Sequence, residues 1–261
     1  MPVQAPTPKV SSFRVIKGSM IPETYAAFRA WDLTQSKQAN LLRLKAENTV
    51  QAATANWLRD VIFTISARFE PSGRDRPLVL LAQQDPGLEA WRPLLLWQLA
   101  QGELLISHFL KQWLFPRIQD GQERFAAKDV IPYLEGLSGP GGPVEQPWTP
   151  STIKHVAAAL LKLVADFNLL VGGPVKALAP FHLSERGFLY VLYDLVERLK
   201  NPRMVVEAED WRIFLLSPAA VHQELLRLHQ YRRLEYHTAG SIVELKLPCP
   251  NLLAYVEGWT A

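Results

Sequence analysis

Apolar side chains recur every three to four residues along most of the chain, which is the spacing of an amphipathic helix. Ser36 and Thr54 stand where two such runs begin, and their side chains can accept a hydrogen bond from the first helical turn. In the N-terminal half the pattern predicts helices over about 22–31, 36–48, 54–70, 88–101, 103–117 and 127–136.

The same spacing returns after Thr149, which is followed by proline in the order typical of a helix start. Ser184 is a second capping residue, and the Gly-Gly-Pro sequence at 172–174 is typical of a helix end. The C-terminal half is therefore predicted to contain helices over about 149–170, 184–200, 207–215 and 218–230.

The spacing changes to two near the C-terminus. Apolar and polar residues alternate over 234–237 and again over 243–247, and Thr-Ala-Gly-Ser at 238–241 supplies a turn between them. Two short alternating runs joined by a glycine-containing turn predict a β-hairpin.

The clearest break in the pattern is 138–147, where three prolines and three glycines occur within ten residues. Neither a helix nor a strand ladder continues through such a segment. We therefore expect a mostly α fold of two helical modules with helix-turn-helix-like character, the C-terminal one carrying a winged β-hairpin. The expected parts are a disordered tail (1–12), an N-terminal helical domain (13–137), a proline- and glycine-rich linker (138–147) and a C-terminal winged-helix-like domain (148–261).

The composition, 48% hydrophobic and 20% charged over 261 residues, is that of a folded globular protein. The single cysteine, Cys249, excludes an internal disulfide and a multi-cysteine zinc site, and it fits a reducing cytoplasm. The most apolar stretch, 156–173, contains Lys162 and Asp166. Because charged groups are costly inside a bilayer, we interpret this stretch as a core helix and expect no membrane association and no leader peptide.

Positive charge is concentrated in the first third of the chain. Residues 1–77 hold 11 Lys and Arg against 6 Asp and Glu, a net charge of +5. Residues 78–137 have a net charge of −2, and residues 138–261 have none. A local excess of this kind attracts polyanions even though the whole chain carries only +3.

No motif of a catalytic or cofactor site occurs, so we expect no enzymatic activity, no catalytic residues and no cofactor. His222, His229 and His237 are the best candidate metal ligands. The first two are seven residues apart, which separates them by about 10 Å along a helix and is too far to share one ion. We therefore expect no metal site.

Glu207, Glu209 and Asp210 form a carboxylate cluster that permits two interpretations. Carboxylates at a helix start complement the positive end of the helix dipole. The same cluster would also suit a metal-dependent nuclease. We favour the first interpretation and keep the second as an alternative.

The N-terminal helices at 22–31, 36–48 and 54–70 resemble a helix-turn-helix trio with many cations. Such cations would bind DNA phosphates without selecting a sequence, although an ordinary solvated helix face would look the same. The candidate phosphate ligands here are Lys37, Arg43, Lys45, Arg59, Arg68, Arg74 and Arg76.

At the C-terminal end, three helices followed by a hairpin have the order of a winged helix. Arg227 lies on the last helix, and Arg232 with Arg233 opens the hairpin, where paired guanidinium groups could hold phosphate oxygens. The alternative is a hairpin that only covers a helical core. The two interpretations stay open, because this half has no net charge.

Several stretches resemble the BrxA family of the BREX bacteriophage-defence systems, in order over most of residues 13–259. They are Ile21-Pro-Glu-Thr24, Trp148-Thr-Pro-Ser-Thr152, Asp166-Phe-Asn-Leu-Leu170, Leu183-Ser-Glu185 before the 188–199 helix, Trp211-Arg-Ile-Phe-Leu215 and the Ala239-Gly240 turn. The 138–147 linker looks longer than this family outline needs.

The resemblance implies a non-enzymatic, mostly helical accessory protein that binds double-stranded DNA. It would act beside the defence methyltransferase and other BREX components. It does not assign contact residues, so those named above rest on charge and position. The alternative function is a scaffold that recruits other defence proteins without touching DNA, since eight tryptophans exceed ordinary need and protein interfaces favour them.

Overall fold

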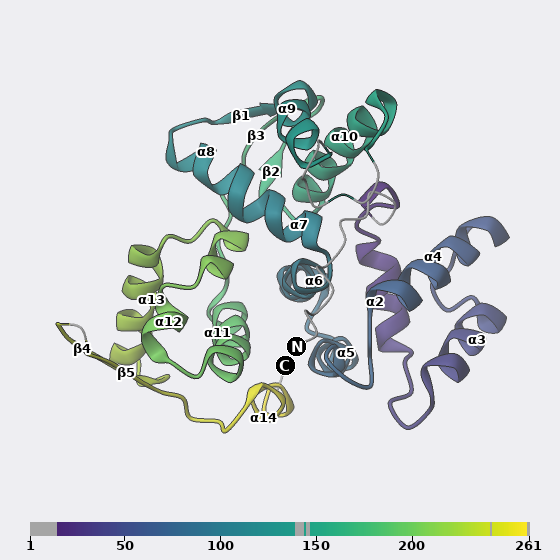
Figure 1. Ribbon diagram of the computed structural model, residues 1–261. Helices are drawn as coiled ribbons and strands as arrows, with labels where there is room; N and C mark the ends of the chain where they lie inside the picture. Colours follow the sequence, from purple (N-terminus) through teal and green to yellow (C-terminus); the bar gives the residue numbers. More distant parts are fainter. Residues whose placement is uncertain (1–14, 139–143, 145–146, 241, 260–261) are drawn as a thin grey trace, which may run out of the picture. The chain divides into compact units, whose positions relative to one another are not determined.

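Short polar side chains begin the helices of the structure, a computed structural model that describes residues 15–138, 144, 147–240 and 242–259. Ser36 Oγ accepts a hydrogen bond from Ala39 N, and Thr54 Oγ1 accepts one from Trp57 N. The helices that lead to residue 102 match the predicted ones, with one addition, α5 (Figure 1). They are α2 (Ile21–Arg29), α3 (Lys37–Glu47), α4 (Ala55–Arg68), α5 (Arg76–Gln83) and α6 (Leu88–Gly102).

Capping also begins the helices of the second half, as predicted at Thr149 and Ser184. The predicted helix at 207–215 is a 3-10 helix, η2. Two short helices, at 202–206 and 252–257, were not predicted. These elements are α10 (Pro150–Asp166), α11 (Glu185–Leu199), α12 (Pro202–Val206), η2 (Glu209–Phe214), α13 (Pro218–Gln230) and α14 (Leu252–Glu257). The described chain is thus mostly helical, and the predicted hairpin is present as β4 (Glu235–Ala239) and β5 (Ile242–Lys246).

The described residues divide into two compact units, and the division differs from the expected one. Unit 1 takes in 15–21 and 99–181, and unit 2 takes in 22–98 and 182–259. The expected boundary at 138–147 falls inside unit 1, because α9 (Ala127–Ser138) and α10, on either side of it, pack against each other. Most of that linker and the expected tail at 1–12 lie outside the described residues.

Unit 1 contains a three-stranded antiparallel sheet that the pattern did not predict. Strand β3 (Val175–Leu178) lies between β1 (Arg124–Ala126) and β2 (Leu170–Val171). The Gly-Gly-Pro sequence at 172–174, expected to end a helix, connects β2 to β3, and α10 already ends at Asp166. The predicted helix at 103–117 is α7 (Leu104–His108), a π-helical turn η1 (Phe109–Leu114) and α8 (Phe115–Gln119).

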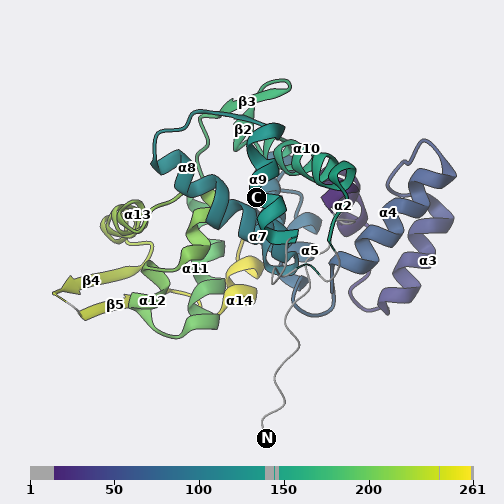
Figure 2. The same cartoon turned by 45° about the horizontal axis from the view of Figure 1, so that its top comes forward.

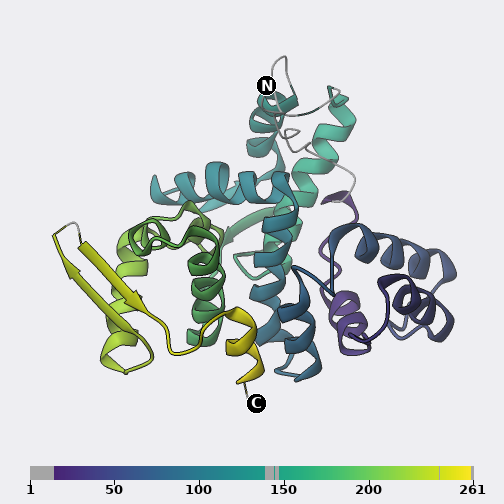
Figure 3. The same ribbon diagram turned by 60° about the horizontal axis from the view of Figure 1, so that its bottom comes forward.

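Unit 2 is built from two separate segments of the chain, 22–98 and 182–259, and α6 contacts helices of both segments. The Phe28 ring of α2 meets Phe69 at 5.2 Å and Trp91 of α6 at 6.1 Å, edge to face. Farther along α6, Trp97 Nε1 donates to Asp194 Oδ2 of α11 at 3.1 Å. Helix α5 packs against α14 (Figure 3). Burying each aromatic side chain of this kind contributes about 1.5–3 kcal/mol, so the two segments of unit 2 stabilise one core.

Among the described residues, no helix is long and apolar enough to cross a membrane.

Candidate nucleic-acid interface

The hairpin β4–β5 is fastened to α13 through Tyr236. The Tyr236 side chain is 2% exposed, and its hydroxyl lies 2.8 Å from His222 Nδ1. Its backbone N–H donates to His229 Nδ1 at 3.3 Å. His229 lies about two turns beyond His222 on the same side of α13. Burial raises the pKa of the Tyr236 hydroxyl. These contacts fix the hairpin at the side of α13, from which it extends outward (Figure 2).

A second set of contacts, here called the Glu185 network, holds the root of the hairpin. Glu185 at the start of α11 accepts from Arg227 Nη2 at 3.1 Å and pairs with Arg233 Nε at 3.0 Å. Arg227 is also bound by Glu224, at 2.7 and 2.8 Å. The hydrogen bonds that Arg227 donates to Glu224 and Glu185 raise the pKa of its guanidinium. Two of the predicted phosphate ligands, Arg227 and Arg233, therefore hold α11, α13 and β4 together.

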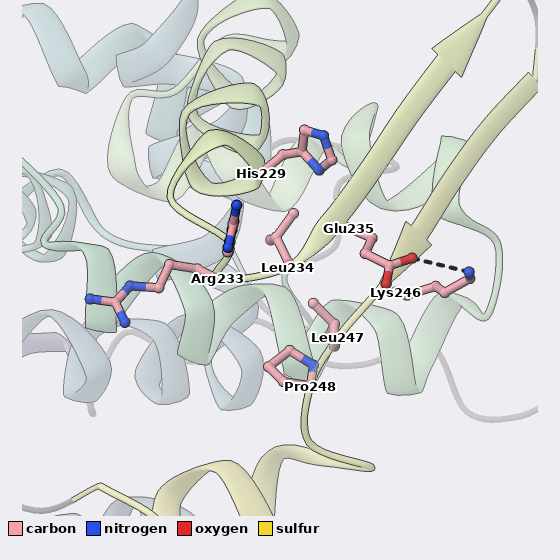
Figure 4. Close-up of a pocket in the computed structure, with 8 residues that line it drawn as sticks. His229, Arg233, Leu234, Glu235, Lys246, Leu247 and Pro248 are labelled. Atoms are coloured by element: carbon pink, nitrogen blue, oxygen red, sulfur yellow. Dashed lines mark hydrogen bonds and ion pairs between the residues drawn. The ribbon is translucent and has the colours of Figure 1, made fainter.

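A pocket of about 370 Å³ lies where α13 meets the hairpin, and His229, Arg232 and Lys246 are among the residues that line it (Figure 4). Lys246 Nζ is 3.0 Å from Glu235 Oε2 across the two strands. That hydrogen bond lowers the pKa of the Glu235 carboxyl and raises that of the Lys246 ammonium. Arg232 lies at the pocket with an exposed side chain and forms no ion pair among the described residues.

Four of the N-terminal candidates serve the fold. Lys37 Nζ pairs with Glu70 at 2.7 Å, and the Arg74 guanidinium bonds to the buried Asp75 at 3.3 Å. Arg43 donates to the Ala30 carbonyl beyond the end of α2. Arg68 is 5% exposed, so it lies in the core rather than on a surface that DNA could reach.

The remaining candidates face solvent in unit 2. Lys45 of α3 and Arg59 of α4 are exposed, and Arg76 at the start of α5 is half-buried. None of the three forms an ion pair among the described residues. With Arg232, they are the members of the predicted set whose charge is free for a phosphate.

The carboxylate cluster near η2 is paired with arginines. Glu207 Oε1 is 2.9 Å from Arg203 Nε, and Glu209 Oε1 is 3.0 Å from Arg212 Nη1. Asp210 Oδ2 is 4.0 Å from Arg198 Nη2. Each carboxylate thus lies beside an arginine, which Asp210 shares with Asp194, and this favours the structural interpretation over a shared metal ion.

The three candidate histidines do not converge on one point. His222 and His229 each bond to Tyr236, and His237 meets His229 only through its ring, at 4.8 Å between centroids. No group of three or more His, Cys, Asp or Glu among the described residues is arranged to hold a metal ion.

Two pairs of residues at this surface were not predicted from the sequence. Glu185 and Tyr236 organise the arginines and the hairpin, yet their partners lie 7 to 48 positions away in the chain. Gln223 and Leu226 lie exposed on α13, with Leu226 38% exposed. The helical spacing of α13 could have identified the second pair, since both lie opposite its apolar stripe.

Comparison with protein-family models matches residues 12–193 to the BrxA family. The match covers α2 to most of α11 and ends before α13 and the hairpin. Neither the curated proteins nor the solved structures gave a match.

Proposed function

This chain belongs to the BrxA family and is therefore a component of a BREX phage-defence system, and from this premise we propose that it binds double-stranded DNA without catalysing a reaction. The observation that carries the proposal is the C-terminal part of unit 2. There α11, α12 with η2, and α13 are followed by a hairpin that Tyr236 fastens to α13. This is the order of elements in a winged helix, in which the third helix enters the major groove and the wing reaches adjacent backbone.

The free cations of unit 2 supply the affinity. Lys45, Arg59 and Arg232 are exposed, and each phosphate they neutralise releases a counterion from the duplex. Contacts of this kind position a protein on DNA and carry no sequence information.

The absence of catalysis is part of the proposal. The polar clusters that could perform chemistry, the carboxylates near η2 and the histidines of α13, are engaged by arginines and by Tyr236. A metal-dependent nuclease would need several of these carboxylates to face one ion.

The test is duplex binding by fluorescence anisotropy with the full chain and charge-reversal variants. Arg59→Glu and Arg232→Glu each weaken binding of a duplex about tenfold or more in low salt, because a phosphate contact is replaced by repulsion. Lys154→Glu is the matched control, since Lys154 is exposed on α10 of unit 1. Equal affinity for all three variants and the unmodified protein contradicts the proposal.

A scaffold that recruits other BREX components is the second candidate. Six of the eight tryptophans are buried, so the tryptophan content reflects the core rather than an interface. The observation that favours a scaffold is instead an exposed apolar pair, Leu42 of α3 at 61% and Phe63 of α4 at 57%. If Leu42→Glu abolishes co-purification of other BREX proteins and Arg59→Glu leaves duplex affinity unchanged, the scaffold replaces the DNA-binding proposal.

A further inference from the structure

The solvent face of α13 carries no charge. Ala219, Gln223, Leu226 and Gln230 are its exposed residues after the first position. At 100° per residue they fall within an arc of about 60°. The opposite side, with Val221, Leu225 and Leu228, is fully buried.

The charged and titratable side chains of α13 point to either side of this arc and are occupied. On one side His222 and His229 bond to Tyr236 of the hairpin. On the other, Glu224 and Arg227 belong to the Glu185 network. The arc is therefore a strip of amide and aliphatic groups. The fastened hairpin borders it, and the free cation Arg232 follows its C-terminal end.

We propose that this strip reads A·T base pairs in the major groove, with Gln223 as the specificity-determining residue; the inference rests on the proposed DNA binding. A glutamine amide can donate to adenine N7 and accept from adenine N6, whereas thymine presents a methyl group that favours apolar contact. Ala219 and Leu226 lie about one turn on either side of Gln223, where they meet thymine methyls of neighbouring pairs.

Guanine is excluded by the same geometry. Direct recognition of guanine O6 and N7 uses an arginine or a lysine. The only such residue on α13 is Arg227, and two carboxylates hold it at 2.7 to 3.1 Å. The strip can thus discriminate for adenine and thymine, while Arg232 at its C-terminal end binds a phosphate of any sequence.

The experiment is selection of bound duplexes from a randomised library by the full-length protein, by Gln223→Ala and by Gln223→Arg. The matched control is Gln38→Ala, which removes an exposed helical glutamine from α3. The unmodified protein and the control enrich duplexes with A·T pairs at fixed positions. Gln223→Ala loses roughly 5- to 150-fold discrimination at one of them, and Gln223→Arg moves the preference there to guanine. Gln223→Ala and Gln38→Ala keep the unmodified protein's affinity for random duplex, whereas Gln223→Arg, which adds a cation, binds random duplex several-fold more tightly.

Three outcomes overturn the inference, and they are distinguishable. Enriched duplexes without A·T preference, or with a preference that Gln223→Ala leaves intact, contradict base reading by α13 and leave DNA binding in place. Failure of every protein to retain any duplex contradicts the proposed function as well. Loss of a co-purifying protein in Gln223→Ala with unchanged duplex selection would assign the strip to a protein partner instead.

Discussion

Glu185 decides how much positive charge the root of the hairpin presents. One carboxylate neutralises Arg233 at 3.0 Å and half of Arg227 at 3.1 Å. Glu185→Gln removes the negative charge and leaves Arg233, which is 60% exposed, free to turn toward a phosphate. We expect duplex affinity to rise several-fold and the salt dependence to steepen by up to about one unit.

The matched control for this variant is Glu123→Gln, which changes the net charge equally at an exposed site of unit 1. The free energy of unfolding should fall by about 1 kcal/mol or less in Glu185→Gln, because the network is partly solvated. Anisotropy titrations in which both variants bind equally would show that Glu185 does not restrain Arg233.

Arg59 and Arg68 lie nine residues apart on α4 and have opposite roles. Arg68 is 5% exposed, so Arg68→Ala removes buried packing and buried polar contacts. We expect it to lower the free energy of unfolding by about 2–4 kcal/mol, and Arg59→Ala to change it by less than about 0.5 kcal/mol. Urea denaturation measures both. Arg59→Ala should weaken duplex binding although the fold is intact, and the reverse pattern would contradict the structure.

His108 makes the stability of unit 1 depend on pH. Burial, and to a lesser degree the Lys111 charge, lowers the pKa of the His108 imidazole. The unfolded chain therefore binds a proton more readily than the folded one, and stability falls as pH drops below the ordinary histidine value of about 6.5. Its Nδ1 lies 2.8 Å from the Tyr133 hydroxyl, a contact that suits the neutral ring.

Thermal denaturation at about pH 7.5 and about pH 5.5 tests this dependence. His108→Asn should reduce the difference in midpoint between the two conditions, whereas His155→Asn, at an exposed site of α10, should not. An equal difference in the two variants would mean that His108 is protonated alike in the folded and unfolded states.

The sequence shows where the positively charged residues are, but it does not show which carboxylates they pair with. Lys37 pairs with Glu70, and Arg233 pairs with Glu185, at separations of 33 and 48 positions along the chain. No local pattern encodes such a pairing, because it exists only once the core has brought distant segments together. The prediction therefore named ten phosphate ligands, of which Lys45, Arg59, Arg76 and Arg232 keep a free charge.

At the level of elements, the turn between β2 and β3 requires a specific residue. Gly172 has φ +116°, and a Cβ there would lie 2.9 Å from the Val175 carbonyl oxygen. We expect Gly172→Ala to lower the free energy of unfolding by about 1–3 kcal/mol. The neighbouring Gly173 has open space around it.

Gly173→Ala is thus the control, and it should change the stability by no more than about 0.5 kcal/mol. Equal effects in a denaturant titration would contradict the β2–β3 geometry.

Long elements were predictable and short ones were not. Caps at Ser36, Thr54, Thr149 and Ser184 correctly placed four helix starts, since each cap acts within three residues of itself. The strands of unit 1 have two to four residues, too few to show alternation. Their pairing joins Phe125 to Lys176, so the sheet depends on contacts between distant segments.

For the whole molecule, the described chain begins in unit 1, passes to unit 2 at residue 22, returns to unit 1 at residue 99 and enters unit 2 again at residue 182. The proline- and glycine-rich segment suggested a boundary because it interrupts the local pattern. A compact unit is defined instead by the surfaces that bury each other. The hydrogen bond from Trp97 of α6 to Asp194 of α11 is a contact of this kind. The helix-turn-helix character of the two modules remains a prediction.

The central claim, that this chain binds duplex DNA mainly through phosphate contacts, is tested most directly by a salt titration of binding. With four free cations, the logarithm of the affinity should fall linearly with the logarithm of the salt concentration, with a slope of roughly −3 to −4. Between about 50 and 200 mM salt the affinity would drop roughly 100-fold. No binding at 50 mM, or an affinity that salt does not change, would contradict the claim.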